Sequence, residues 1–493
     1  MRFMAFLGIL CCLAPCMLRA ADPAEAPAPH TEADSKAESK DGENKHGEAP
    51  HDKGNAEGHA KDGHSSRISD EYIPLQIDAM PKRPKPIIEL GEPFKGTGTL
   101  APGFTLPTGA VWQPSLLVFG TARMAVQSND LGGGRVSEAV ARLDLFANLQ
   151  LSGSERLVLG FRNLDQDGRF TSYVFENERP GGEDGSFDEL NAEVGTLFFE
   201  GDFGEIFPYL SPRDFKPTDI GFAIGRQPLF FQEGMLINDT IDGIGLTRNS
   251  VLPKKTSNFR ATLFYGWNNV NRSSPVETGR LFGLFTSTDF RKSTMDIDAA
   301  FVQGENNLDD VLTVGLSAVQ RIGLTNTSFR FLGSFPSGDD TAADNGYLVL
   351  SEVSWTPLGT HDHVYINTFW AGNEFFAAAL DPSVGGPLGR AGISFTSVGL
   401  GQYGAALSAR AIDTAGAAFG YQSFFAHNRQ QLIFELAGRL DTEEGLGDQY
   451  ATTLRYQTAM GRRAVFVLDG FANWLEVIDD YSYGGRLELV VSF

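Results

Sequence analysis

Apolar and polar residues alternate with a period of two through most of the chain, from residue 112 to residue 493. In residues 139–151 the odd positions are all Ala or Leu, while the even positions include Arg142, Asp144 and Gln150. A period of two places successive side chains on opposite faces of a β-strand and does not fit a helix. The chain is therefore predicted to be all-β. Further segments with this pattern are residues 259–267, 295–301 and 328–335.

The number and length of these segments favour a closed barrel over a soluble sandwich. Roughly 16 to 20 segments are present, each with the length of a tilted membrane strand of ~9–11 residues. Many charges fall in the middle of the polar faces, where the water-filled interior of a barrel would solvate them. We expect residues 112–493 to form a transmembrane antiparallel β-barrel of about 18 strands. The uncharged, Gly-rich stretch 391–409 is expected to contribute two strands around a turn.

Three segments precede the predicted barrel. Residues 1–20 have the pattern of a secretory signal peptide, with a positive start, an apolar core and small residues at the end. Residues 21–66 are a low-complexity segment rich in His and acidic residues, which cannot bury enough apolar surface to fold and is expected to be disordered. Residues 67–111 form a Pro-rich connector. Two readings of the connector stay open, a periplasmic linker and a plug inside the barrel.

Histidine is concentrated in the segment 21–66. Imidazoles beside carboxylates bind divalent transition metals weakly. The irregular spacing fits no fixed tetrahedral site, so a solvated spacer and a weak metal site both stay open. The candidate ligands are His46, His51, His59 and His64.

Charge and cysteine content exclude several function classes. The net charge of −22 argues against nucleic-acid binding, because phosphate recognition needs a basic surface. The three cysteines, Cys11, Cys12 and Cys16, all lie in the predicted signal peptide. The exported protein would then have no thiol for zinc, Fe–S clusters, disulfides or catalysis. We expect no enzyme activity and no cofactor.

The final strand resembles the C-terminal signature of bacterial outer-membrane β-barrels. Leu487, Leu489 and Val491 lie on one face of that strand, and the terminal Phe493 continues the same face. In that family the signature is read by the barrel-assembly machinery. The resemblance implies an exported protein in the outer membrane of a Gram-negative bacterium, surrounded by lipid and lipopolysaccharide, with the tail 21–66 in the periplasm.

Within this class the chain resembles large single-chain porins of the alginate-export type. The resemblance rests on Gly225-Arg226-Gln227 and on a run from Asp239 to Gly243, followed by Thr247-Arg248. These residues are similar to a Gly-Arg-Gln strand and an Asp-Gly turn of those porins. The resemblance implies a channel for small hydrophilic solutes, and both a monomer and a homotrimer fit it.

Arginine far outnumbers lysine in the predicted barrel, since residues 112–493 contain 24 Arg, 4 Lys and 46 Asp plus Glu. The guanidinium group pairs bidentately with carboxylate, phosphate or sulfate. If the apolar faces lie against lipid, these charges point into the lumen. There they either form a selectivity constriction, or they only keep the interior hydrated and cross-link the strands of the wall. The predicted pore-lining residues are Arg123, Arg142, Asp144, Arg162, Arg260, Asp296, Asp298, Arg330, Arg455, Arg486 and Glu488.

Taken together, these features predict a porin that allows passive diffusion of small hydrophilic or charged solutes through a charged lumen. Two alternatives stay open. One is a substrate-specific porin for an anionic polysaccharide or a metal chelate. The other is a non-conducting scaffold or adhesin whose lumen is blocked by residues 67–111.

Overall fold

The computed structural model describes residues 84–91, 102–166, 168–210, 219–271, 279–304, 310–337, 345–443 and 447–493. The predicted signal peptide, the segment 21–66 with His46, His51, His59 and His64, and most of the connector 67–111 lie outside these residues. The assignments of the signal peptide, the weak metal site and the connector therefore stay predictions.

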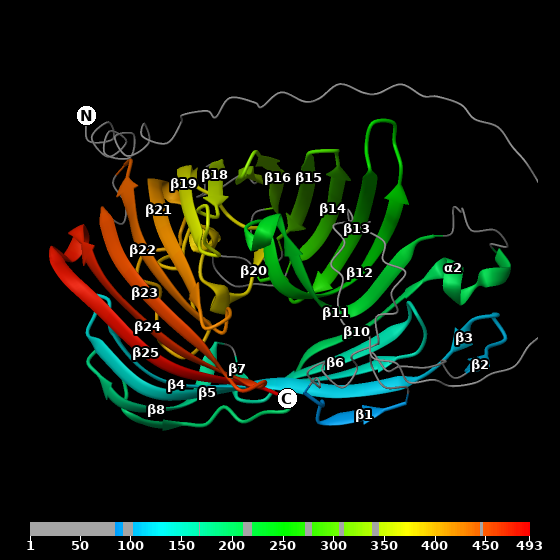
Figure 1. Cartoon of the computed structure of the whole chain (residues 1–493), viewed down its shortest axis with the longest axis horizontal. Helices are drawn as coiled ribbons and strands as arrows, with labels where there is room; N and C mark the ends of the chain where they lie inside the picture. The colour runs from blue at the N-terminus through cyan, green and yellow to red at the C-terminus, as the bar shows by residue number, and fades with distance from the viewer. Residues whose placement is uncertain are drawn as a thin grey trace, which may run out of the picture. The chain divides into compact units, whose positions relative to one another are not determined.

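Among the described residues, eighteen antiparallel strands form a closed ring (Figure 1). Each wall strand pairs with the next, and the ring closes where β25 pairs with β4, with Val490 opposite Arg123. The prediction of an antiparallel barrel of about 18 strands is confirmed. The wall strands are β4 (Ser115–Asp130), β5 (Arg135–Gln150), β6 (Arg156–Arg162), β10 (Val194–Asp202), β11 (Gly221–Phe231), β12 (Ile237–Val251), β13 (Asn258–Asn268), β14 (Arg280–Asp289), β15 (Ser293–Gln303), β16 (Asp310–Ile322), β17 (Thr325–Ser337), β18 (Gly346–Trp355), β19 (His363–Glu374), β21 (Ile412–Phe425), β22 (Gln430–Asp441), β23 (Gln449–Met460), β24 (Ala464–Leu475) and β25 (Asp480–Ser492).

Shorter elements extend or connect the wall. β8 continues the line of β6 along β5, and β9 pairs with β8. β1 pairs with the first residues of β4, so this described part of the connector adds to the wall. No helix in the described part of the chain is long and apolar enough to cross a membrane. The short elements are β1 (Ile88–Leu90), β2 (Phe104–Thr105), β3 (Val111–Trp112), β7 (Asp165–Gln166), β8 (Arg169–Asn177), β9 (Gly185–Phe187), β20 (Ala379–Leu380), the helix α2 (Phe203–Ile206) and the 3-10 turns η2 (Pro208–Leu210), η3 (Gln232–Gly234), η4 (Pro382–Val384), η5 (Pro387–Arg390) and η6 (Glu476–Ile478).

The two faces of the wall have opposite chemistry. Leu468 of β24 and Leu487 of β25 are cross-strand partners, and both side chains are about half exposed. One residue further along the same strands, the partners Asp469 and Arg486 are buried. Neighbouring residues of a strand face opposite sides of the sheet. Apolar residues that face outward therefore alternate with charged residues that face the barrel interior. The outer surface has the character of a lipid-facing belt.

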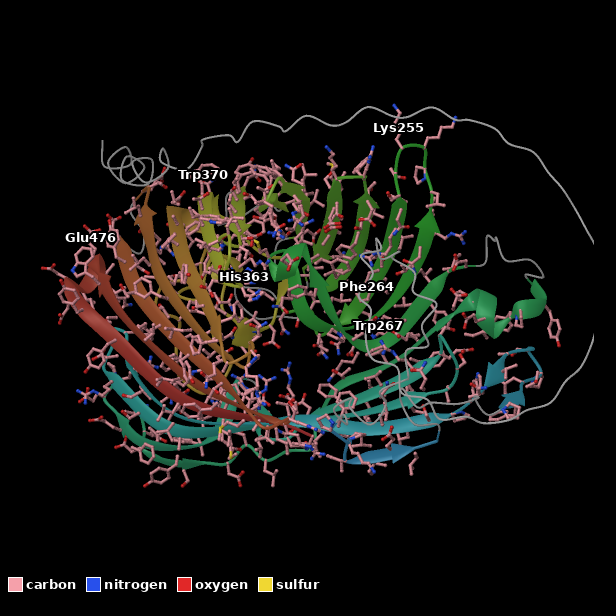
Figure 2. All side chains as sticks on the ribbon, viewed as in Figure 1. Lys255, Phe264, Trp267, His363, Trp370 and Glu476 are labelled. Carbon is pink, nitrogen blue, oxygen red and sulfur yellow. The ribbon has the colours of Figure 1, made fainter. Side chains whose placement is uncertain are left out.

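Two chain segments fold into the barrel and give it an apolar core. One is the turn between β11 and β12, and the other is the long connection 375–411 between β19 and β21. Leu236, Leu388 and Phe395 from these segments are fully buried against wall residues such as Phe264, which is labelled in Figure 2. The inner face of this part of the wall is therefore covered by protein rather than by water.

The expectation of two strands within residues 391–409 is wrong. The structure has no strand there, and the segment runs through the barrel interior as turns and irregular backbone. Its lack of charge reflects burial, and its glycines permit conformations that a strand does not use. Gly399 and Gly401, for example, have φ values of 58° and 62°.

The apolar belt predicts a position-dependent cost for an added charge. Replacing the outward-facing Leu468 by Arg should destabilise the barrel by about 2–4 kcal/mol, the cost of a cation near the middle of the bilayer. Leu358→Arg is the matched control, because Leu358 is 86% exposed in the turn after β18. Urea unfolding of the barrel in lipid would measure both. Equal stability of the two variants would argue against a lipid-facing Leu468.

Candidate functional site

The β11–β12 hairpin leaves the wall at a hydrogen-bonded bend. Arg226 of β11 and Asp242 of β12 are cross-strand partners, and Arg226 Nε donates to Asp242 Oδ1 at 2.9 Å. Arg226 Nη1 also donates to the carbonyl of Val194, close to where the β10–β11 pairing ends. Gly225 has φ 121°, and a Cβ there would come within 2.2 Å of the Leu197 carbonyl oxygen. These contacts allow the hairpin to turn inward.

The Gly225-Arg226-Gln227 run lies in a strand, as the resemblance implied, but the Asp239–Gly243 run does not form the implied turn. Asp242 and Gly243 lie inside β12 rather than in a turn. The actual turn is residues 232–236, inside the barrel. The two runs pair with each other and form the bend of the hairpin, not its turn.

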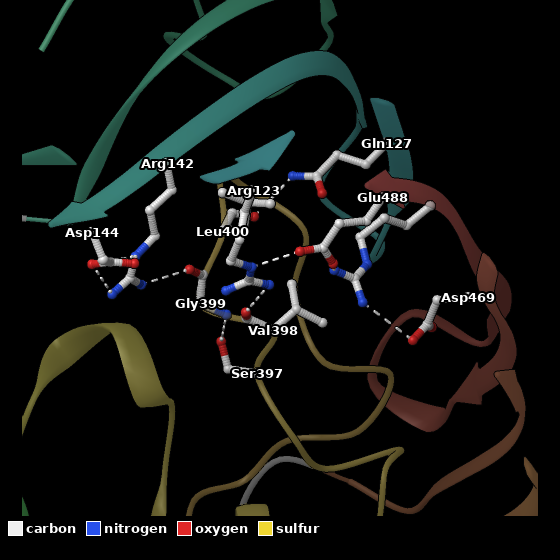
Figure 3. Close-up of polar contacts among 11 residues, drawn as sticks. Arg123, Gln127, Arg142, Asp144, Ser397, Val398, Gly399, Leu400, Asp469 and Glu488 are labelled. Carbon is white, nitrogen blue, oxygen red and sulfur yellow. Dashed lines mark hydrogen bonds and ion pairs between the residues drawn. The ribbon is translucent and has the colours of Figure 1, made fainter. Parts of the chain in front are cut away.

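Three consecutive carbonyls of the 375–411 segment each accept a hydrogen bond from the wall (Figure 3). Arg123 Nη2 donates to Val398 O at 3.0 Å. Arg142 Nη1 donates to Gly399 O at 3.2 Å, and Gln127 Nε2 donates to Leu400 O at 2.9 Å. The wall strands β4 and β5 therefore fix this part of the segment by its backbone.

A neighbouring part of the wall holds the same segment through β22. Both oxygens of the buried Glu435 accept backbone N–H bonds, from Ile393 at 2.9 Å and from Ser394 at 2.7 Å. Arg439 donates to the carbonyls of Ser408 and Arg410. Irregular backbone is stable inside the barrel because these side chains satisfy its polar groups.

Charged and polar side chains form a continuous row around the inner wall from β23 to β5. Each residue of the row is the direct cross-strand partner of the next: Arg455, Asp469, Arg486, Gln127 and Glu138. Asp469 accepts from Arg455 at 2.6 Å, and Gln127 Nε2 donates to Glu138 at 2.8 Å. Most of this row is buried beneath the inward segment.

The predicted pore-lining residues separate into three groups. Arg123, Arg142 and Arg162 line a cavity of about 550 Å³ between β4–β6 and the two inward segments, which we call the eyelet. The second group lines a wider cavity of about 1230 Å³ on β10–β15, which we call the vestibule: Arg260, Asp296 and Asp298. The remaining predicted residues line neither cavity and are held in ion pairs of the inner wall: Asp144, Arg330, Arg455, Arg486 and Glu488.

The eyelet is lined by both charged and apolar residues. Four arginines and three carboxylates line it among the described residues. Arg142 is held by Asp144 at 3.0 Å, whereas Arg162 makes a longer contact of 3.4 Å with Asp381. Its charged lining residues are Arg123, Arg142, Arg162, Arg390, Glu233, Asp239 and Asp381, and its apolar ones include Pro228, Leu229, Phe230, Met235, Val384 and Pro387.

Three charged lining residues were not predicted from the sequence, and all of them lie on the two inward segments: Glu233, Asp381 and Arg390. They fall outside the alternating pattern on which the prediction of lining residues depended. One signal was available: the interval between the last clear strand before residue 391 and the next after 409 is longer than an ordinary turn, and long structureless connections are often functional.

Asp381 fixes the start of η4 next to Arg162. Burial raises the pKa of its carboxyl group, but the hydroxyl and backbone N–H of Ser383 and the Arg162 guanidinium outweigh burial. The pKa of Asp381 is therefore below its ordinary value of 3.8. The ionised carboxylate is the form that favours the folded segment.

The described residues contain no group of three or more His, Cys, Asp or Glu side chains placed to hold a metal ion. The lining residues of the eyelet can supply hydrogen bonds, ion pairs and apolar contacts.

The barrel is similar to solved outer-membrane porins. A BenF-like porin from Pseudomonas fluorescens Pf-5 matches with a TM-score of 0.54 and 10% identity, over 77% of this chain and 98% of that chain. OccK2 (OpdF) of Pseudomonas aeruginosa, solved alone and in complex with glucuronate, matches with a TM-score of 0.52 and 11% identity over the same shares. No family model and no curated protein matches the chain. The chain has the fold of an outer-membrane β-barrel porin.

Loss of one backbone anchor should loosen the inward segment. Arg142→Ala removes the donor to Gly399 and should increase amide exchange in residues 396–404 by about tenfold, since hydrogen bonds to charged groups contribute about 1.5–3 kcal/mol. Arg156→Ala is the control, because Arg156 pairs with Glu200 of β10. Hydrogen exchange with mass spectrometry would measure this. Unchanged protection in Arg142→Ala would show that the anchor is dispensable.

The lowered pKa of Asp381 predicts an acid-dependent loss of stability. The contribution of this carboxylate is present above its unfolded value of 3.8 and is lost as the pH falls through the lower folded value. The stability difference between the wild type and Asp381→Asn should therefore shrink in unfolding titrations from about pH 5 to about pH 2. Asp184→Asn, in an exposed loop, serves as the control. A difference that stays constant over this range would contradict the prediction.

Proposed function

We propose that the protein is an outer-membrane porin that passes small organic anions by diffusion, without a covalent step. The observation that carries the proposal is the eyelet, whose lining combines four arginines with three carboxylates and several apolar residues. Guanidinium groups bind carboxylates with directional, bidentate hydrogen bonds. The apolar lining residues, among them the exposed Phe230, would contact the carbon skeleton of the same solute.

The dimensions of the eyelet support a small solute. Its volume of about 550 Å³ lies within the ordinary range of small-molecule sites, about 300–1,000 Å³. The likeness to OccK2 (OpdF), which has been solved in complex with glucuronate, supports a monomeric organic acid as the first solute to test. Passage of an anionic polysaccharide or a metal chelate has less support from this geometry.

A second candidate function is passage of cations, and the vestibule favours it. Seven carboxylates and two arginines line the vestibule among the described residues. Under the main proposal, the same carboxylates would repel an anion that has left the eyelet and so would keep it from binding in the vestibule. Conduction requires binding that is weak enough for release. The two candidates differ in the sign of their ion selectivity.

Further parts of the assignment belong to this proposal. We place residues 21–66 in the periplasm and the barrel among lipid and lipopolysaccharide. Recognition of Leu487, Leu489, Val491 and Phe493 by the barrel-assembly machinery stays a prediction, as do metal binding by the tail and a trimeric state. The outward exposure of Leu487 is compatible with such recognition.

Single-channel recording in planar bilayers under a KCl gradient tests the main proposal. Stable open steps with an anion-selective reversal potential, reduced by glucuronate and not by glucose, are expected. Arg162→Glu should lower the anion-to-cation permeability ratio by about tenfold, the lower end of the effect of charged clefts on local ion concentration. Arg321→Glu, which changes an exposed residue at the end of β16, should leave this permeability ratio unchanged. Cation selectivity would favour the second candidate, and a folded but silent barrel would favour a non-conducting scaffold.

A further inference from the structure

Glu233, at the tip of the β11–β12 hairpin, lies where the two cavities of the barrel adjoin. It lines both the eyelet and the vestibule, together with Leu229 and Phe230. Its side chain is 43% exposed, so a solute in either cavity can reach it. A solute moving between the two cavities would therefore pass this carboxylate.

Glu233 takes part in a closed ring of ion pairs that joins the two inward segments to the wall. Its oxygens lie 3.7 Å from Arg330 Nη2 of β17 and 3.7 Å from Arg390 Nη1 of η5. The same two arginines contact Glu352 of β18 more closely, with Arg390 Nε donating at 3.0 Å. Glu233 is therefore the loosely held carboxylate of the ring, and Glu352 is the tightly held one.

The two arginines of the ring are not equivalent. Arg330 is 3% exposed and is fixed in the wall, whereas Arg390 is 45% exposed and lines the eyelet. Only Arg390 is thus accessible to a solute anion. Glu233 contacts that guanidinium at Nη1, whereas Glu352 contacts it at Nε.

The backbone around Glu233 is strained. Gln232, Glu233 and Gly234 have φ values of 51°, 55° and 82°, a region that is unfavourable for residues with a side chain. Gln232 is held by a hydrogen bond from its Nε2 to Asp298 Oδ2 at 2.7 Å. A turn of this kind persists only while the surrounding contacts hold it.

We propose that Glu233 is a tethered carboxylate that occupies the solute's binding position on Arg390 and is displaced by each passing organic anion. This inference rests on the proposed function. Long, half-exposed ion pairs are weak, and a solute carboxylate that binds Arg390 bidentately can replace one. Glu233 thereby sets which anions pass: those that cannot pair with Arg390 leave the tip in place between the cavities.

The test compares charge-removing variants in planar bilayers, with glucuronate as the probe. Glu233→Gln should bind glucuronate about two- to fivefold more tightly, the factor given by losing one competing exposed ion pair. Arg390→Gln should bind it more weakly than the wild type. The matched control is Glu205→Gln, which removes the same charge from the vestibule lining outside the ring. Far-UV circular dichroism, and a difference in mobility between heated and unheated samples in SDS gels, would show that each variant is folded.

The outcomes separate this inference from the function on which it rests. Tighter glucuronate block in Glu233→Gln, with little change in Glu205→Gln, supports the tethered carboxylate. Equal effects in both variants would overturn it, because they would reflect only the general field of the lumen. So would unchanged affinity in Glu233→Gln within an anion-selective channel that glucuronate blocks. A wild-type channel that ignores glucuronate would instead contradict the proposed function.

Discussion

Every irregular stretch of backbone inside a barrel must find hydrogen-bond partners that its own secondary structure does not supply. Here the inner wall supplies them. Residues 398–400 receive donors from β4 and β5, and Glu435 accepts two N–H groups of residues 393 and 394. The eyelet exists because these hydrogen bonds hold the 375–411 segment across the lumen. Wall side chains that would line an open pore thus become structural supports for the element that narrows it.

The same constraint explains what the sequence could and could not predict. Alternation with a period of two is a local property, and it identified the barrel and the inward direction of residues such as Arg142 and Arg486. Whether such a side chain faces water or supports a buried loop depends on contacts far away in sequence. Arg142 and Gly399 are 257 residues apart, and no local pattern relates them. The uncharged stretch 391–409 was misread as strands for this reason, since buried loops and buried strands share an apolar composition.

The runs around Gly225 and Asp242 show a different limit. Their resemblance to a porin motif implied a strand and a turn, and only the strand is present where the motif implied it. The structure assigns them to a bend, where Gly225 avoids a collision with the Leu197 carbonyl and Arg226 pairs with Asp242. The position of the η3 tip inside the lumen follows from that bend. Glu233 and Arg390, on separate inward segments, could be brought together only by the complete fold.

The row of paired side chains from Arg455 to Glu138 crosses the seam where β25 meets β4. That seam joins residues such as Arg123 and Glu488, which are 365 positions apart, so its closure costs more chain entropy than any hairpin of the wall. A slip of one residue at the seam would turn Leu487 inward and Arg486 toward lipid. Only one alignment of the first and last strands therefore keeps the charges of this row out of the membrane.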